Sequence, residues 1–404
     1  MAVVIDVDSG IDVLIGDEDD AESEIWSGKQ ASTSELATKG GFDQQASWQA
    51  FEVLVDNAIR SGREIHFLPP YRADAAQRLS RLTRIGTRDL AGRASIDLIR
   101  AVVSLREVKS SLEIDEISKT MAVTAEAHLE AMRAARPGAY EYEGVAAMRY
   151  ALGRHGLEEA YAPVFTKNGH VLHNNSYGNK LASGDLVVND YGANSASGYA
   201  TDITRTIPVG GRFLPDQIAI YDALLRVQQA AIDAVKPVET FASVHRIAAT
   251  GIAREMTELG FFAGNVDDLF ESGAYAICFP HGLGHQLGLD VHDMESLGED
   301  HVGYDAERRR STLFGLRNLR LGKRLLEGMV VTVEPGIYFI PPLIHAWKAE
   351  GRHRGLINYE KFEAYAGFGG IRIEDNVAID RNEARVLSAM IPKTREEIES
   401  AMSA

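Results

Sequence analysis

Apolar residues along the chain fall into short strand-like runs and longer runs with helical spacing. Near the N-terminus, residues 3–15 are apolar on both sides of Asp8-Ser9-Gly10, a pattern typical of a β-hairpin. A helical pattern follows over residues 45–61, and residues 64–68 have the composition of a strand. These segments predict a small α/β domain over residues 1–105.

The rest of the chain predicts a larger domain over residues 106–404. Its first helix, over residues 111–135, has apolar side chains three and four residues apart. At its start, Lys109 and Glu113 have the spacing of an i,i+4 ion pair. Further strands are predicted over residues 186–190, 199–209, 329–339 and 370–379, and further helices over 217–235 and 242–259. Helices alternate with strands whose connections are mostly too long for hairpins, which indicates an α/β or α+β fold.

Composition narrows the classes of partner and compartment. The 404 residues carry a net charge of −16, which argues against binding to nucleic acid or to an anionic membrane. Cys278 is the single cysteine, so no intrachain disulfide is possible and a reducing compartment is favoured. The N-terminus lacks the pattern of a signal peptide, and no apolar run reaches the roughly 18 residues of a membrane span. We expect a soluble, cytoplasmic protein.

The densest group of chemically active side chains is the segment His281–Asp293. It holds three of the chain's 12 histidines and two aspartates. His281 and His285 are four residues apart, a spacing that fits a helix face or a hydrogen-bonded loop as well as a metal site. Glu does not follow His281, so the segment differs from the helical zinc motif of metalloproteases.

Four carboxylates elsewhere stand at the ends, or on one face, of predicted strands: Asp190, Asp202, Glu334 and Glu374. Each alone is typical of a turn cap or a surface acid. With one imidazole they form a self-neutralising set for two divalent cations, and oxygen-rich ligation suits Mn²⁺, Co²⁺ or Zn²⁺. Two such ions about 3.5–4 Å apart can share a hydroxide that is nucleophilic at neutral pH. Charge balance alone does not select these four from 58 acidic residues.

Motifs over residues 104–385 supply that selection. They are Leu105–Ile114, Val171–Asn174, Asn189–Gly192, Ala200–Thr206, His281–Asp293, Thr332–Tyr338 and Gly369–Asp375. Together they resemble the pita-bread metallopeptidase family of methionine aminopeptidases, Xaa-Pro aminopeptidases, prolidases and creatinase. The resemblance implies a C-terminal pita-bread catalytic domain behind a small, shortened creatinase-like N-terminal α/β domain. It also implies a homodimer in which the N-terminal domain shapes the partner's cleft.

The resemblance also implies roles for individual residues. Asp190 would chelate one metal ion, Asp202 and Glu374 would bridge, and His285 and Glu334 would complete the second site. His173 and His292 match histidines that flank the substrate and stabilise the oxyanion, and His281 and Arg372 match positions behind the ligands or on the substrate side. Arg320 matches the residue that prolidases use for the free proline carboxylate. Residues 158–163, just before His173, have no clear counterpart in the family.

These roles predict a prolidase, which hydrolyses Xaa-Pro dipeptides with a hydroxide shared by two metal ions while Glu334 moves the proton. The charged segment 293–311 is similar to an insertion in prolidase-like members. An Xaa-Pro aminopeptidase acting on longer peptides is the main alternative. A non-catalytic binding module, metal-free creatine-type hydrolysis and a Cys278–His281 thiol nucleophile are less favoured, because the metal-ligand types are all present. For Cys278 we expect a buried strand position instead.

Overall fold

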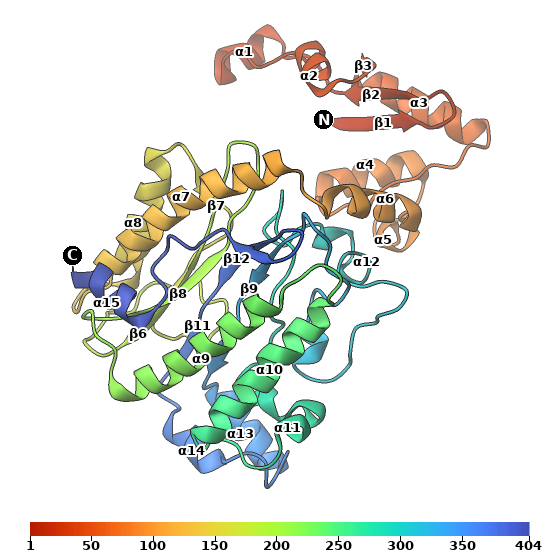
Figure 1. The fold of residues 1–404 in the computed structure, drawn as a ribbon. Helices are drawn as coiled ribbons and strands as arrows, with labels where there is room; N and C mark the ends of the chain where they lie inside the picture. The colour runs from red at the N-terminus through yellow and green to blue at the C-terminus, as the bar shows by residue number, and fades with distance from the viewer. Residues whose placement is uncertain (404) are drawn as a thin grey trace. The chain divides into compact units, whose positions relative to one another are not determined.

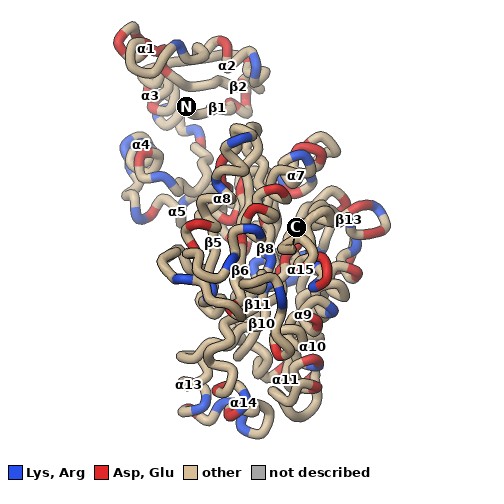
Figure 2. Tube along the Cα trace, turned by 90° about the vertical axis from the view of Figure 1, so that its left-hand side faces the viewer, with Lys and Arg blue, Asp and Glu red and all other residues tan. Residues whose placement is uncertain are grey.

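The computed structural model describes residues 1–403, which form two compact units (Figure 1). The first unit is Met1–Ile99, and the second runs from Arg100 towards the C-terminus. Acidic and basic residues are interspersed along the trace (Figure 2). Among the described residues, no helix has both the length and the apolar character needed to cross a membrane.

The first unit contains a small sheet and a set of helices. Its elements are β1 (Ala2–Asp6), β2 (Ile11–Ile15), α1 (Ala21–Ser27), α2 (Thr33–Gly40), β3 (Gln44–Ala46), α3 (Trp48–Arg60), α4 (Ala73–Thr83), α5 (Leu90–Arg93) and the start of α6 (Ile96–Arg106). The predicted hairpin is confirmed, since β1 pairs with β2 in antiparallel register. The helix predicted over residues 45–61 is α3, which starts later than expected. The Ser47 side chain accepts a hydrogen bond from the backbone N–H of Ala50 and caps this helix.

The predicted strand over residues 64–68 is wrong. This segment lies between helices α3 and α4 and forms no strand. The sheet of this unit is complete as β1-β2-β3 within the described residues. An alternating sequence favours an extended backbone, but a strand also needs a partner for its N–H and C=O groups.

The second unit has more helices and four small sheets. Its helices are α7 (Ser111–Ala134), α8 (Glu141–Arg154), α9 (Pro215–Ala234), α10 (Phe241–Glu258), α11 (Val266–Ser272), α12 (Glu299–Val302), α13 (Pro341–Glu350), α14 (Tyr359–Ala364) and α15 (Arg395–Ser403), with 3-10 turns η1 (Ala274–Ile277), η2 (Glu295–Leu297) and η3 (Leu316–Asn318). Its strands are β4 (Glu158–Glu159), β5 (Val164–Thr166), β6 (Leu186–Tyr191), β7 (Ala193–Asn194), β8 (Ile203–Pro208), β9 (Val330–Val333), β10 (Gly336–Tyr338), β11 (Gly370–Arg372), β12 (Asp375–Ile379) and β13 (Ala384–Val386).

Two antiparallel helix pairs flank the strands of this unit (Figure 1). Helix α7 packs on α8, and α9 packs on α10. The sheets have the strand orders β5-β6-β8, β13-β12-β9, β10-β11 and β4-β7. Two of them meet where the backbone N–H of Glu374 donates to the carbonyl of Thr204 at 3.0 Å. The ends of β6, β8, β9 and β11 therefore converge in the middle of the unit.

The predicted strand over 186–190 is confirmed as β6, but the other three predicted strands are shorter or divided, and each break lies at a functional candidate. Strand β8 begins only at Ile203, after Asp202. The predicted strand over 329–339 divides into β9 and β10 around Glu334 and Pro335, and the one over 370–379 divides at Glu374. A residue at a break has a side chain that is free to leave the alternating pattern of the sheet.

The predicted Lys109–Glu113 ion pair is also wrong. Glu113 instead accepts the backbone N–H of Ser110 at 2.7 Å and closes a capping box at the start of α7. Lys109 points into the unit and donates to Asp293 at 2.8 Å.

A buried ion pair behind the converging strands fixes the position of Glu374. The Arg205 guanidinium contacts Asp375 at 2.8 Å and also donates to the Glu374 carbonyl at 2.6 Å. Lys393 adds a second cation, 2.7 Å from Asp375. Although burial opposes ionisation, the charges of Arg205 and Lys393 hold the pKa of Asp375 well below its usual range.

Replacing Gly192 by Ala should destabilise the protein by about 2 kcal/mol. A Cβ at this position would lie 1.7 Å from the carbonyl oxygen of Thr201, the residue before Asp202. The matched control is Gly153→Ala in helix α8, where a Cβ meets no atom within 4 Å and Ala has the better helix propensity. Thermal melts should show a lower midpoint for Gly192→Ala and an equal or higher one for Gly153→Ala. Equal midpoints for both variants would contradict the close approach of Gly192 to the Thr201 carbonyl.

Candidate metal centre

The side chains singled out from the sequence line one cavity of about 570 Å³. They are Asp190, Asp202, His285, Glu334, Glu374, His173, His281, His292, Arg320 and Arg372. They come from segments that are up to about half the chain apart. The tertiary structure therefore brings the whole predicted set to one place.

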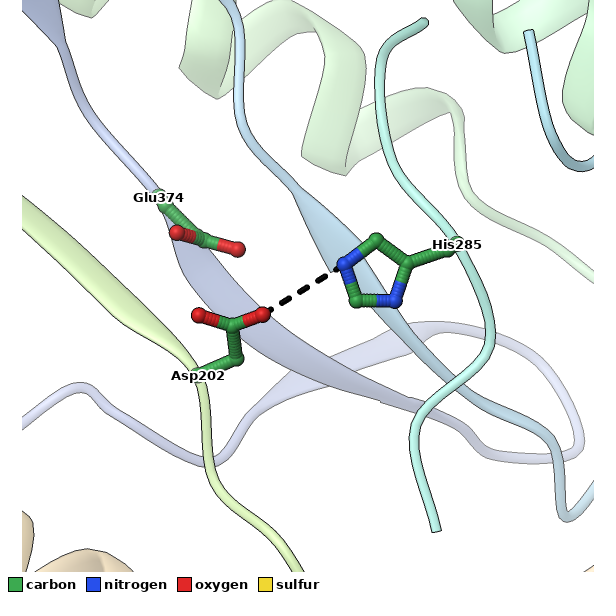
Figure 3. Close-up of side chains that lie close together, drawn as sticks. All are labelled: Asp202, His285 and Glu374. Carbon is green, nitrogen blue, oxygen red and sulfur yellow. Dashed lines mark ion pairs between the residues drawn. The ribbon is translucent and has the colours of Figure 1, made fainter. Parts of the chain in front are cut away.

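Three of these side chains form the tightest group, shown in Figure 3. One ligand-type atom each from Asp202, His285 and Glu374 lies within 4.8 Å of the others. The ring nitrogen Nε2 of His285 is 3.4 Å from Asp202 and 3.6 Å from Glu334. The other ring nitrogen, Nδ1, lies 3.0 Å from the Gln286 carbonyl, which turns Nε2 towards the acids.

Asp190 joins this group through a donor that it shares with Asp202, the Tyr161 hydroxyl. Its Oδ2 accepts a hydrogen bond from Arg372 at 2.5 Å, and its Oδ1 accepts one from the Tyr161 hydroxyl at 2.6 Å. The same hydroxyl also contacts Asp202. Sequence reasoning missed Tyr161, because it lies in the 158–163 segment without a family match. Its role depends on contacts to residues far away in the chain.

The donor set fits divalent cations. The Oε2 atom of Glu374 accepts a hydrogen bond from Thr204 at 2.7 Å, but its buried Oε1 atom has no hydrogen-bond partner among the described residues. Burial and the neighbouring carboxylates raise the pKa of Glu374, and the same causes raise the pKa of Glu334 to about 7. These acids are therefore packed closely enough to need positive charge between them, and two divalent cations would balance four carboxylates.

The three candidate histidines outside the ligand set have different surroundings. His292 makes an edge-to-face contact with His285, with ring centres 4.3 Å apart. Burial and the charge of His285 lower the pKa of His292 to about 2, so its ring is neutral. Both nitrogens of His281 have protein partners, the Gly282 carbonyl at 2.8 Å and the Tyr338 hydroxyl at 2.9 Å. His173 lies on the exposed side of the cavity.

Arg372 is held by protein groups rather than left free for a ligand. It is 4% exposed, and besides Asp190 it donates to the Thr204 hydroxyl and to the Tyr338 hydroxyl, each at 3.0 Å. These contacts suit a side chain that orients Asp190.

A second buried ion pair anchors the loop that carries His285 and His292. Asp293, 1% exposed, contacts Lys109 at 2.8 Å and Arg106 at 2.6 Å. Its backbone N–H donates to the Gln286 carbonyl at 3.0 Å and closes the loop. The Lys109 contact found in place of the predicted Glu113 pair therefore helps to position the histidines.

Cys278 is buried, but it does not lie in a strand as predicted. It follows the 3-10 turn η1, and its sulfur contacts the Tyr275 carbonyl at 3.4 Å. Burial raises the pKa of the Cys278 thiol, which keeps it protonated. This environment disfavours a thiolate nucleophile.

Comparisons with known proteins agree on one family. The sequence profile of metallopeptidase family M24 matches residues 115–381. The human Xaa-Pro dipeptidase is 34% identical over 310 residues, which cover 75% of this chain and 61% of the human protein. The Xaa-Pro aminopeptidase of Escherichia coli strain K12 is 32% identical over 408 residues, which cover 97% of this chain and 82% of that protein. The structure of aminopeptidase PepP from Pseudomonas aeruginosa superposes with a TM-score of 0.76 at 28% identity, covering 97% of this chain and 82% of that one.

Adding Mn²⁺ to metal-stripped protein should raise its melting midpoint by about 5 °C or more, because a ligand that binds only the folded state stabilises it. Glu374→Gln should lose this rise and retain little metal, since it removes one carboxylate from the buried group. Glu383→Gln, at an exposed position, is the matched control and should behave like the unchanged protein. Calorimetric melts and elemental analysis of dialysed protein measure both effects. Full metal content in Glu374→Gln would remove Glu374 from the ligand set.

Proposed function

This chain belongs to metallopeptidase family M24, and on that premise we propose that it hydrolyses the peptide bond before proline in Xaa-Pro dipeptides. Its second unit has the pita-bread fold of its structural relatives. The observation that carries the proposal is the shared cavity, in which Asp202, His285 and Glu374 meet and Arg320 lies on the wall.

The buried acids would hold two divalent metal ions. Asp190 would help to hold one ion, Asp202 and Glu374 would serve both ions, and His285 and Glu334 would help to hold the second. When bound, the two ions would polarise the scissile carbonyl and lower the pKa of a water molecule. We take Mn²⁺ as the native metal, with Co²⁺ or Zn²⁺ as alternatives, because the donor set is rich in oxygen and has a single imidazole.

Glu334 moves the proton in this proposal. The bond before proline is a tertiary amide, and its nitrogen leaves only after protonation. Glu334 lines the cavity and lies 3.6 Å from the His285 ring, so its carboxylate can take a proton from the attacking water and deliver it to that nitrogen.

His292 and His173 stabilise the oxyanion in this scheme. Both line the cavity, and a neutral imidazole such as that of His292 retains one N–H to donate. His281 and Arg372 act behind this pair. Both contact the Tyr338 hydroxyl, which links them into one support for the site.

Arg320 provides the dipeptide preference. A free proline carboxylate can accept two parallel hydrogen bonds from a guanidinium, whereas a longer peptide continues as a neutral amide. The protein contacts of Arg320, to Glu295 and Glu299, are both made by Nη1. The other two guanidinium nitrogens, Nη2 and Nε, are the donors that a substrate carboxylate could engage.

An Xaa-Pro aminopeptidase acting on longer peptides is the second candidate. One observation favours it: the similar solved structures, such as PepP from Pseudomonas aeruginosa, are aminopeptidases, and PepP covers 97% of this chain. The same residues would carry out the reaction. The two candidates differ only in whether Arg320 binds a substrate carboxylate. A non-catalytic binding module is disfavoured, because the full set of candidate metal ligands lines one cavity.

The proposal includes a homodimer in a reducing, cytoplasmic compartment. The single cysteine of the chain is buried, which suits that compartment. Light scattering during gel filtration measures the oligomeric state, and a monomer at micromolar concentration would remove the dimer from the proposal.

Hydrolysis of Ala-Pro beside Ala-Pro-Ala tests the proposed substrate. With Mn²⁺-loaded protein, we expect release of alanine from the dipeptide at a kcat/KM at least about tenfold above that for the tripeptide, because only the dipeptide presents a carboxylate to Arg320. A preference for the tripeptide would establish the aminopeptidase instead. If metal-loaded protein cleaves neither, the Xaa-Pro assignment fails.

Arg320→Ala should raise KM for Ala-Pro by about tenfold, the effect of losing a charge-assisted hydrogen bond, and should change KM for Ala-Pro-Ala much less. Arg317→Ala is the matched control, since Arg317 is exposed in the same segment and lies over the Phe314 ring. Steady-state kinetics on both substrates measure the difference. Equal effects on the two substrates would remove Arg320 from carboxylate recognition.

A further inference from the structure

The charged segment 293–311 places acids around Arg320. The Nη1 atom of Arg320 donates a hydrogen bond to Glu295, and the same atom lies 3.6 Å from Glu299. The Glu295 side chain is 13% exposed and that of Arg320 is 33% exposed. A carboxylate of the protein therefore already lies against the guanidinium that the proposed function assigns to a substrate carboxylate.

The segment 293–311 places further charges near Arg320. Arg310 pairs with Glu299, and its Nε atom lies 3.1 Å from Asp300. Two guanidinium groups, Arg310 and Arg320, thus face three carboxylates, Glu295, Glu299 and Asp300, which leaves a net charge of −1. An incoming carboxylate therefore meets a guanidinium that is already partly neutralised rather than an unopposed positive charge.

Glu295 also lies beside His292, which lines the cavity. Its Oε2 atom lies 3.7 Å from Nδ1 of His292. The cation that compensates the charge of Glu295 is Arg320, and the two side chains form one ion pair.

We propose that Glu295 is a positioning residue that holds Arg320 through Nη1 and so shares its guanidinium with a substrate carboxylate bound at Nη2 and Nε. The inference rests on the proposed function and adds a determinant of specificity to it. While the site lacks substrate, Glu295 holds the long Arg320 side chain in place. When a carboxylate binds, the two like charges repel each other across one guanidinium, which weakens binding of free carboxylates relative to neutral amides.

Glu295→Gln separates charge from shape. Glutamine has nearly the same volume, and its amide oxygen can still accept the hydrogen bond from Arg320 Nη1. Removing the negative charge should therefore strengthen binding of a substrate carboxylate without releasing Arg320. A substrate that ends in a neutral amide should respond far less.

The test compares the Mn²⁺-loaded enzyme and Glu295→Gln on Ala-Pro and on its amide, Ala-Pro-NH₂. We expect KM for Ala-Pro to fall about fivefold, the upper range for a partly exposed charge pair, and KM for the amide to change by less than about twofold. Glu307→Gln is the matched control, because Glu307 is exposed in the same segment and pairs with Arg308 at 3.3 Å. It should leave both KM values unchanged.

An unchanged or raised KM for Ala-Pro, or equal shifts for both substrates, would overturn the inference. Glu295→Ala, which also removes the charge, must give the same preference if Glu295→Gln does not fold. If the unchanged enzyme cleaves neither substrate, the proposed function fails, but calorimetric binding of proline and prolinamide still decides the role of Glu295. Proline should then bind Glu295→Gln about fivefold more tightly, and prolinamide equally well to both proteins.

Discussion

Repulsion between acids buried in one cavity is the constraint on which the rest of the second unit depends. Glu374 has a buried oxygen without a partner among the described residues, and the pKa of Glu334 is raised to about 7 by burial and its neighbours. Cations between the acids would stabilise such a group, provided that the scaffold holds each acid in place. The breaks in the strands at Glu334 and Glu374 serve this arrangement, because they release the side chains from the sheets at the place where the sheets meet.

The scaffold holds the acids and the histidines with two buried ion pairs placed behind them. The Arg205–Asp375 pair fixes the backbone of Glu374, and the Lys109–Asp293 pair fixes the loop of His285 and His292. Breaking a buried pair by removing one partner typically costs about 3–5 kcal/mol, so each pair strongly couples site geometry to stability. The residues of these two pairs do not line the cavity. The residues that do line it can therefore change without breaking either pair.

In the proposed function, that wall recognises the C-terminal side of the substrate. Arg320 alone would be a strong site for any carboxylate. With Glu295 and Glu299 beside it, the guanidinium is oriented but partly neutralised. Such a network would weaken the binding of carboxylates in general and leave selectivity to the remaining contacts, because the nearby acids repel any incoming carboxylate.

The sequence by itself determined the helices with clear caps, the hairpin at residues 3–15 and the set of candidate ligands, because these depend on local patterns and on family motifs. It failed for the strand at 64–68 and for the partner of Lys109, because sheet pairing and buried ion pairs depend on residues far away in the chain. Tyr161 and Glu295 could be found only in the tertiary structure. Tyr161 contacts Asp190, 29 residues away, and Glu295 contacts Arg320, 25 residues away. No local pattern encodes such contacts, since only packing decides which distant side chains share a cavity.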